Sequence, residues 1–259
     1  METHISVIFK IMDRFRKRPL LAPEISIAVN GIITRPLYKT GGYFIFTDLA
    51  PGETCFEFAA PVFQKETLTA DIPAPGRGYI LSHLLLNPSR AYPFGGSVTT
   101  VAGRIIRDKL PWSNRQFYLV PDNGMELMKV AEDNAGAGND DLKLFVSGPQ
   151  TKLSFPGEYL IKDKDEGKRE VCLITRGDAR DGTYALEKGI NFSHSRGTPL
   201  VGVVACRTTA DGSFFTALPD LAGEQVALDL LVEAKNGKGS KKTVQIAGNQ
   251  YNILADLEI

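Results

Sequence analysis

The stretch Thr40–Ile72, TGGYFIFTDLAPGETCFEFAAPVFQKETLTADI, decides the fold of this chain. Gly41-Gly42 indicates a turn, because glycine adopts positive φ without steric cost. Phenylalanines then occupy every second position on both sides of a second turn at Pro51-Gly52, as in strands with one buried face. The expected inward residues are Phe44, Phe46, Phe56 and Phe58. The stretch therefore predicts a β-hairpin with an aromatic core.

The order of these residues, GGYFIFTDLAPG at 41–52 and APVFQKE at 60–66, resembles the carboxypeptidase-regulatory-like (transthyretin-like) β-sandwich. That family has an alternating Phe strand, a TDL-x-PG turn and an Ala-Pro-Gly-Tyr-like bend. Gly41 and Val62 stand where the family has Asp and Gly. The resemblance implies an all-β sandwich of a kind that is usually non-catalytic.

A second signature of the same kind lies near the carboxyl end. RGTPLVGV at 196–203 resembles the family's G-x-PL-x-G-V strand, and TTADGSF at 208–214 resembles its T-x-ADG-x-F turn. Alternating apolar positions follow over 226–232 and 251–259. The chain thus carries two transthyretin-like signatures, and residues 97–195 are either an insertion in the second or a separate β module.

These patterns predict four regions: an amino-terminal arm (1–23), a transthyretin-like sandwich (24–73), a connector (74–95) and a larger all-β domain (96–259). The arm fits two periods. Ile5, Ile8, Phe9 and Met12 mark a helical face, whereas Val7 and Ile11 alternate with Ile5 and Phe9 as on a strand. It is expected to pack on its own protein, to dock on a partner subunit, or to lie on a membrane surface.

Composition limits the classes of function. The 259 residues include 30 basic and 30 acidic side chains, and zero net charge argues against nucleic acid as the main partner. No apolar run approaches the roughly 20 residues that span a bilayer. The amino terminus lacks the order of a secretory signal, so a cytoplasmic protein, incorporated into a larger assembly, is expected. Cys55, Cys172 and Cys206 suggest neither a disulfide framework nor a metal site.

A search for catalytic motifs finds none. The three histidines lack metal-ligand spacing. Ser193-His194-Ser195 places hydroxyls beside an imidazole, but neighbours on a strand point to opposite faces, so His194 is predicted to be a surface loop residue. The acidic loop 132–141 does not match an EF-hand. We therefore expect no enzyme activity, no metal and no cofactor.

An apolar outward register is the most informative irregularity. If Phe44 and Phe46 point inward, Tyr43 and Ile45 point outward, where a solvated sheet face would be polar. Burial against another part of the chain explains this, as does a contact with another protein. The predicted protein interface comprises Ile5, Ile8, Phe9, Met12, Tyr43 and Ile45.

The leading functional prediction is a non-enzymatic structural or interaction (adaptor) protein, which self-associates or binds a protein partner. The family resemblance places such modules in bacterial surface proteins and phage-tail-like assemblies. The first alternative is a carbohydrate- or peptide-binding module that uses Trp112, Tyr118 and Tyr92 for stacking. The second alternative is a hydrolase whose site lies in the larger domain.

Overall fold

The computed structural model describes residues 3–96, 98–121, 126–133, 137–146, 155–178, 180–218, 221, 225–232 and 240–259. The chain divides into two units, Met1–Phe94 and Gly95–Ile259. Regular structure in the described residues consists of strands and two short 3-10 turns, η1 (Ala22–Glu24) and η2 (Glu166–Lys168). The predicted all-β class, with β-sandwich sheets, is confirmed.

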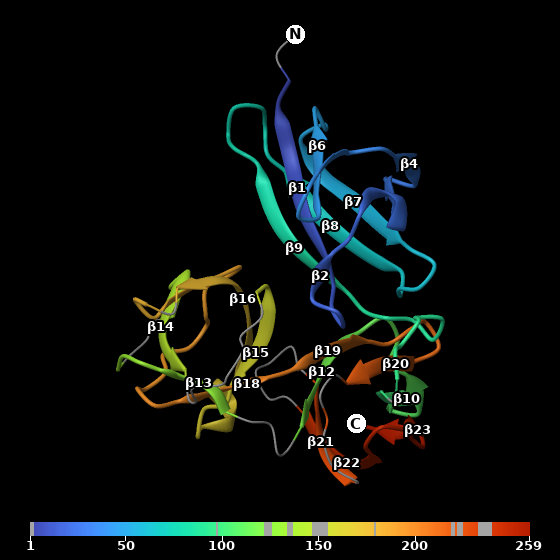
Figure 1. Ribbon diagram of the computed structural model, residues 1–259, viewed down its shortest axis with the longest axis vertical. Coiled ribbons are helices and arrows are strands. Elements are labelled where there is room, and N and C mark those ends of the chain that lie inside the picture. The colour runs from blue at the N-terminus through green and yellow to red at the C-terminus, as the bar shows by residue number, and fades with distance from the viewer. Residues whose placement is uncertain are drawn as a thin grey trace. The chain divides into compact units, whose positions relative to one another are not determined.

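The first unit is a sandwich of two sheets (Figure 1). In one sheet β1 pairs with β2, β6 and β9, and β6 pairs with β5. The other sheet has the order β4-β3-β7-β8. The strands of the first unit are β1 (Ile5–Asp13), β2 (Arg18–Pro19), β3 (Ser26–Val29), β4 (Ile32–Thr34), β5 (Leu37–Lys39), β6 (Tyr43–Thr47), β7 (Gly52–Ala59), β8 (Glu66–Ile72) and β9 (Ile80–Leu86).

The core of this sandwich is the predicted phenylalanine cluster. Phe44, Phe46, Phe56 and Phe58 are all buried, which confirms the inward register of β6 and β7. Phe9 joins them from β1 and makes edge-to-face contacts with Phe46, Phe56 and Phe58, with ring centroids 4.9 to 6.0 Å apart. Such pairs add stabilisation beyond the burial of apolar area.

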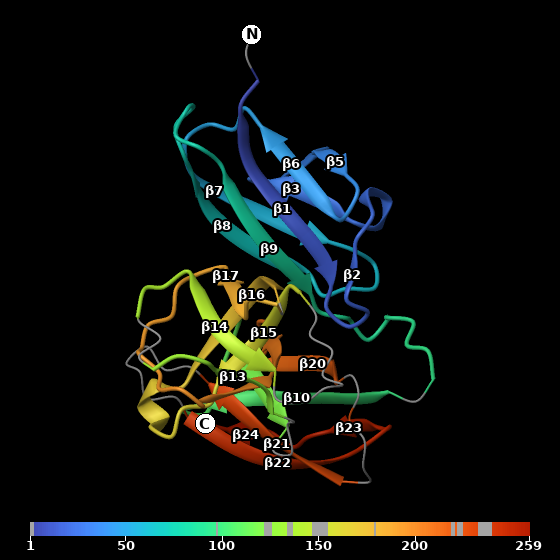
Figure 2. The same ribbon diagram turned by 60° about the vertical axis from the view of Figure 1, so that its left-hand side comes forward.

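The expected arm and connector are corrected by the strand pairing. β1 lies between β6, with antiparallel pairing, and β9, with parallel pairing (Figure 2). Its inward side chains Val7, Phe9 and Ile11 are fully buried, because the alternation of apolar residues matches the two-residue period of a strand. The first sandwich therefore needs β1 from residues 1–23 and β9 from residues 74–95, beyond the predicted range 24–73.

The second unit contains another sandwich. In one sheet β10 pairs with β11, β20, β23 and β24, and the other sheet has the order β19-β12-β21-β22. The strands of the second sandwich are β10 (Thr99–Arg107), β11 (Leu110–Pro111), β12 (Gln116–Pro121), β19 (Val204–Arg207), β20 (Ser213–Leu218), β21 (Gln225–Val232), β22 (Ser240–Ala247), β23 (Tyr251–Ile253) and β24 (Leu257–Glu258).

A closed barrel stands between β12 and β19 in the sequence, with the strand order β13-β14-β17-β16-β15-β18. These strands are β13 (Glu126–Val130), β14 (Asp141–Val146), β15 (Gly157–Ile161), β16 (Glu170–Asp178), β17 (Thr183–Leu186) and β18 (Pro199–Gly202). Val120 of the sandwich packs with Leu160 and Val201 of the barrel. The open question about residues 97–195 is thus answered: the second sandwich contains an inserted barrel.

The two sandwiches repeat one strand order. The sheet β4-β3-β7-β8 corresponds to β19-β12-β21-β22, and the centre of the other sheet, β9-β1-β6, corresponds to β23-β10-β20. The barrel occupies the place that the short turn between β3 and β4 holds in the first sandwich.

Gly42 and Gly212 fix the residue-by-residue correspondence. Their φ angles are +80° and +79°, and an added Cβ would lie 2.6 Å from the Ile11 carbonyl oxygen and 2.7 Å from that of Ile105, respectively. Ile11 N–H donates to the Gly42 carbonyl, and Ile105 N–H donates to the Gly212 carbonyl. Both turns need glycine, because a side chain would be strained at this φ and would collide with the neighbouring strand. Gly42 thus corresponds to Gly212, and Ile11 to Ile105.

Candidate functional site

The outward face of the first sandwich, on the sheet centred on β1, carries a row of apolar side chains across four strands. Ile8 on β1 pairs with Ile45 on β6 and with Leu81 on β9, and Ile45 pairs with Leu37 on β5. We call Leu81, Ile8, Ile45 and Leu37 the first apolar row. Leu81 is 48% exposed and Leu37 is 62% exposed. Exposed apolar side chains that adjoin in this way mark contact surfaces.

The predicted interface residues fall into two groups. Ile8, Met12, Tyr43 and Ile45 lie at alternate positions to the inward core residues and so share the outward face. Phe9 belongs to the core, which corrects its assignment to an interface. Met12 and Ile45 are also buried, so their exposed neighbours offer most of the accessible surface. Ile5 is exposed at the start of β1.

The sequence-based interface omitted Leu37 and Leu81. Leu37 follows Pro36 in a three-residue strand, which is too short to show a period. Leu81 lies in the predicted connector (74–95), for which no strand pairing is predicted. Only the pairing of β9 with β1 places Leu81 beside Ile8.

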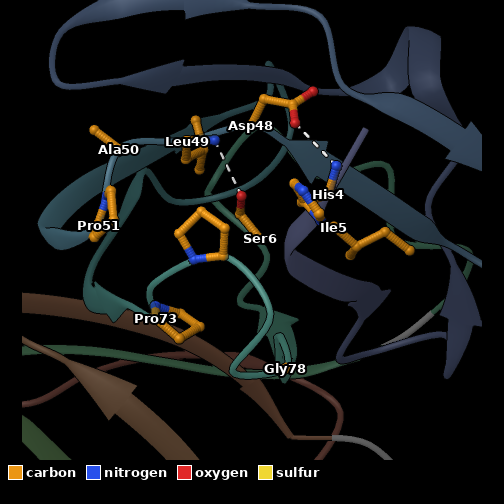
Figure 3. A pocket seen from close by; sticks show the side chains of 10 residues that line it. His4, Ile5, Ser6, Asp48, Leu49, Ala50, Pro51, Pro73 and Gly78 are labelled. Carbon is orange, nitrogen blue, oxygen red and sulfur yellow. Dashed lines mark hydrogen bonds between the residues drawn. The ribbon is translucent and has the colours of Figure 1, made fainter. Parts of the chain in front are cut away.

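A cleft of about 290 Å³ opens at the end of the first sandwich where β1 begins (Figure 3). Its lining includes Leu49, Pro51 and Pro73, and the polar residues His4 and Asp48. His4 N–H donates to Asp48 Oδ1 at 2.9 Å, and Leu49 N–H donates to the Ser6 hydroxyl oxygen at 3.0 Å. Both hydrogen bonds use a backbone N–H, so these polar groups fix the loop after β6 against β1.

Tyr92, a predicted stacking residue, is buried. Its ring packs against Phe63 and Phe94, and its hydroxyl donates to Asp13 Oδ2. Burial raises the pKa of Tyr92, and the hydrogen bond to Asp13 adds to this effect. Asp13 also accepts hydrogen bonds from the backbone N–H groups of Phe15 and Arg16. Tyr92 therefore anchors the turn after β1, which corrects its assignment to a ligand platform.

The other two predicted stacking residues lie in the second sandwich. Tyr118 is 9% exposed on β12. Trp112 is partly buried against the core, with its ring centroid 6.5 Å from that of Phe117. A sugar or peptide stacks on an open ring face, which the buried Tyr118 and Tyr92 do not offer. Tyr118 and Tyr92 therefore do not fit the predicted stacking role.

His194 lies between β17 and β18 of the barrel and is only 1% exposed, so the prediction of a surface loop histidine is wrong. Its Nδ1 lies 2.8 Å from Asp163 Oδ2, and its Nε2 lies 2.9 Å from Glu170 Oε1. Both ring nitrogens face a carboxylate oxygen, and only the doubly protonated imidazolium donates at both. The geometry therefore defines a buried cation between two anions.

The electrostatics of this cluster agree with its geometry. Burial works against the charged imidazole, but hydrogen bonds to Glu170 and Asp163 outweigh it and raise the pKa of His194. The hydrogen bond from His194 lowers the pKa of Asp163. Burial would raise the pKa of Glu170, but hydrogen bonds from His194 and Asn191 lower it overall.

Among the described residues no group of three or more His, Cys, Asp or Glu is placed to hold a metal ion. Within the same residues no helix is long and apolar enough to cross a membrane. The three cysteines are free thiols. Burial and the charge of Glu170 raise the pKa of the Cys172 thiol to about 12, which leaves it protonated and unreactive at neutral pH.

Comparison with known proteins gives no family for this chain. No family model and no curated protein sequence matches it. Among solved structures, similarity is found to BcpA, the major pilin subunit of Bacillus cereus, at 8% identity and a TM-score of 0.25, covering 95% of this chain and 69% of BcpA. The Bacillus anthracis TIE protein matches at 11% identity and a TM-score of 0.26, and the match covers 99% of this chain and 50% of the TIE protein chain.

A leucine-rich repeat protein from Bacteroides thetaiotaomicron matches at 10% identity and a TM-score of 0.19, covering 26% of that protein. Superpositions this loose carry no conclusion about function.

Proposed function

We propose that this chain is a non-enzymatic structural or interaction protein that binds a protein partner through the first apolar row. In this proposal the protein is part of a larger bacterial or phage-tail-like assembly that is built in the cytoplasm. The kind of assembly in this proposal comes from the family resemblance alone.

The first apolar row is the observation that supports the proposal. Ile8 and Ile45 form the centre of the row, and the exposed Leu81 and Leu37 flank them on the neighbouring strands. Burying an apolar side chain of this size is favourable by about 1.5–3 kcal/mol, so a partner that covers the row gains binding energy. A face of this kind, which the solvent would otherwise wet, is typical of a protein contact.

Site-specific photo-crosslinking in cells that produce the protein tests this proposal. A photoreactive amino acid replaces Leu81 in one variant and Thr69 in the control. Thr69 is exposed on β8, in the opposite sheet. We expect protein adducts, identified by mass spectrometry, at position 81 and not at position 69. Equal labelling at both positions, or none at either, would overturn the proposal.

A further inference from the structure

The second sandwich carries an apolar row on the outward face of its β10 sheet. Ala102 on β10 pairs with Phe215 on β20 and with Ile253 on β23. Ile253 is 74% exposed, and Tyr251, two residues before it on β23, is also exposed. The rings of Phe215 and Tyr251 lie 6.5 Å apart. We call Ile253, Ala102, Phe215 and Tyr251 the second apolar row.

The two rows occupy the same place in the repeated strand order. Ile8 lies three residues before Ile11, and Ala102 lies three residues before the corresponding Ile105. The residues that pair with Ile8 and with Ala102 on the neighbouring strands therefore correspond as well. The corresponding positions are Ile8 and Ala102, Ile45 and Phe215, and Leu81 and Ile253. Solvated outward faces are normally polar, so an apolar row at one place in both sandwiches is a shared surface feature.

Charge distinguishes the two faces. Beside the first row, the outward positions next to Tyr43 hold Lys10 and Lys39. Beside the second row, Arg104 is accompanied by two acids, Asp256 and Glu258. The first face is therefore positive and the second is negative on balance. Complementary charge favours contact between unlike faces and disfavours contact between two copies of the first face.

We propose that the first apolar row binds the second apolar row of another copy of this chain. The inference rests on the proposed function, because it names the partner of the same surface. Contact between two different faces is heterologous, so each of the two copies in one contact still has its other face available. Such contacts build open chains or closed rings.

The size of the face sets the expected strength. Four strands about 4.8 Å apart, each with about six residues at 3.3 Å, cover roughly 400 Å². A contact of two such faces buries about 800 Å² in total, which is at the low end for protein interfaces. We therefore expect weak, reversible association, which must be measured at high protein concentration.

The test is sedimentation equilibrium of the full chain from about 1 to 300 µM, a range that reaches the concentrations at which weak contacts form. The variants Leu81→Glu and Ile253→Glu each disable one face at an exposed position. Ile33→Glu is the matched control, because Ile33 is 75% exposed on β4, in the other sheet of the first sandwich. We expect the average mass of the wild type and of Ile33→Glu to rise with concentration, and each single-face variant to stay monomeric.

Mixing the two single-face variants gives the deciding result. Leu81→Glu keeps the second face and Ile253→Glu keeps the first, so an equimolar mixture should form a one-to-one dimer and grow no further. A monomeric wild type, a mixture that does not associate, or loss in Leu81→Glu alone would each overturn the head-to-tail inference. Crosslinks from position 81 to a different protein would also overturn it, yet would leave the proposed function standing.

Discussion

The buried His194 gives the sharpest prediction of stability, and the perturbation is His194→Ala. The substitution removes a cation that donates to Asp163 and Glu170 at 2.8 and 2.9 Å. Each hydrogen bond to a charged group contributes about 1.5–3 kcal/mol. Removing one member of a buried charge pair costs about 3–5 kcal/mol, because the remaining charge stays buried without compensation.

The surroundings of Glu170 place the expected loss toward the lower part of this range. Glu170 keeps three other donors, namely the backbone N–H groups of Asn191 and Phe192 and the side-chain amide of Asn191. Asp163 keeps one hydrogen bond, from the backbone N–H of Asp165. We therefore expect His194→Ala to reduce the free energy of unfolding of the barrel by about 3–4 kcal/mol.

The pH dependence has a definite sign. Because the folded-state pKa of His194 is raised, its contribution is complete below its ordinary pKa of about 6.5 and is lost as pH rises through the raised value. The lowered pKa values of Asp163 and Glu170 give contributions that are complete above their ordinary values near 4 and are lost on acidification. The cluster should therefore stabilise the barrel most between about pH 4.5 and 6.5.

Hydrogen-exchange mass spectrometry on β15 and β16 is the suitable assay, because a chain with two units does not guarantee one cooperative transition. Exchange in His194→Ala should be faster by about two orders of magnitude, as 3 kcal/mol implies. The control is His4→Gln, at an exposed histidine outside the barrel. Unchanged exchange in His194→Ala, or protection in the wild type that increases from pH 6.5 to 9, would refute the reasoning.

Three further predictions concern the first sandwich, and hydrogen exchange of the β6 and β7 amides measures each free energy of unfolding. Phe56→Ala should cost about 3–5 kcal/mol, because Phe56 is fully buried against Phe9 and Phe46; a change below about 1 kcal/mol would contradict the core described above. Tyr92→Phe should cost about 1–3 kcal/mol, because buried Asp13 loses a donor, and an unchanged stability would mean that water replaces the hydroxyl. Gly42→Ala should cost about 2–4 kcal/mol. The control Gly76→Ala should cost only about 1 kcal/mol, because Gly76 has a similar φ of +81° but open space around it. Equal costs would exclude the collision with Ile11.

The first hairpin could be predicted because its information is local. Alternating phenylalanines and two glycine-containing turns specify the register of β6 and β7 without reference to the rest of the chain. The outward register of Tyr43 and Ile45 followed from the same alternation. The second signature, around Gly212, likewise depends on a short turn motif, so the repeat was visible in the sequence before any pairing was known.

Non-local pairing explains what the sequence did not reveal. Residues 5–12 satisfy both a helical and a strand period, and the choice is made by β9, about 70 residues later in the chain. His194 lies 31 residues from Asp163 and 24 residues from Glu170, with no spacing that would distinguish the three from solvated loop residues. Asp163 lies in the connection between β15 and β16, Glu170 begins β16, and His194 lies between β17 and β18. The three predict a buried cluster only once β15 and β16 are known to pair.

The inserted barrel also has a consequence for the order of folding. Leu119 and Val204 pair across β12 and β19 although they are 85 residues apart in the chain, whereas Ile27 and Thr34 in the first sandwich are only 7 apart. Closing the longer loop from an unfolded chain costs about 2 kcal/mol more in entropy.

The barrel removes that penalty, because its first and last strands pair with each other, Glu126 with Val201. A folded barrel therefore delivers the ends of β12 and β19 side by side, as a two-residue turn would. We expect the barrel to fold before the sheet that contains it closes, and a barrel that folds slowly to delay the second sandwich while the first folds at its own rate.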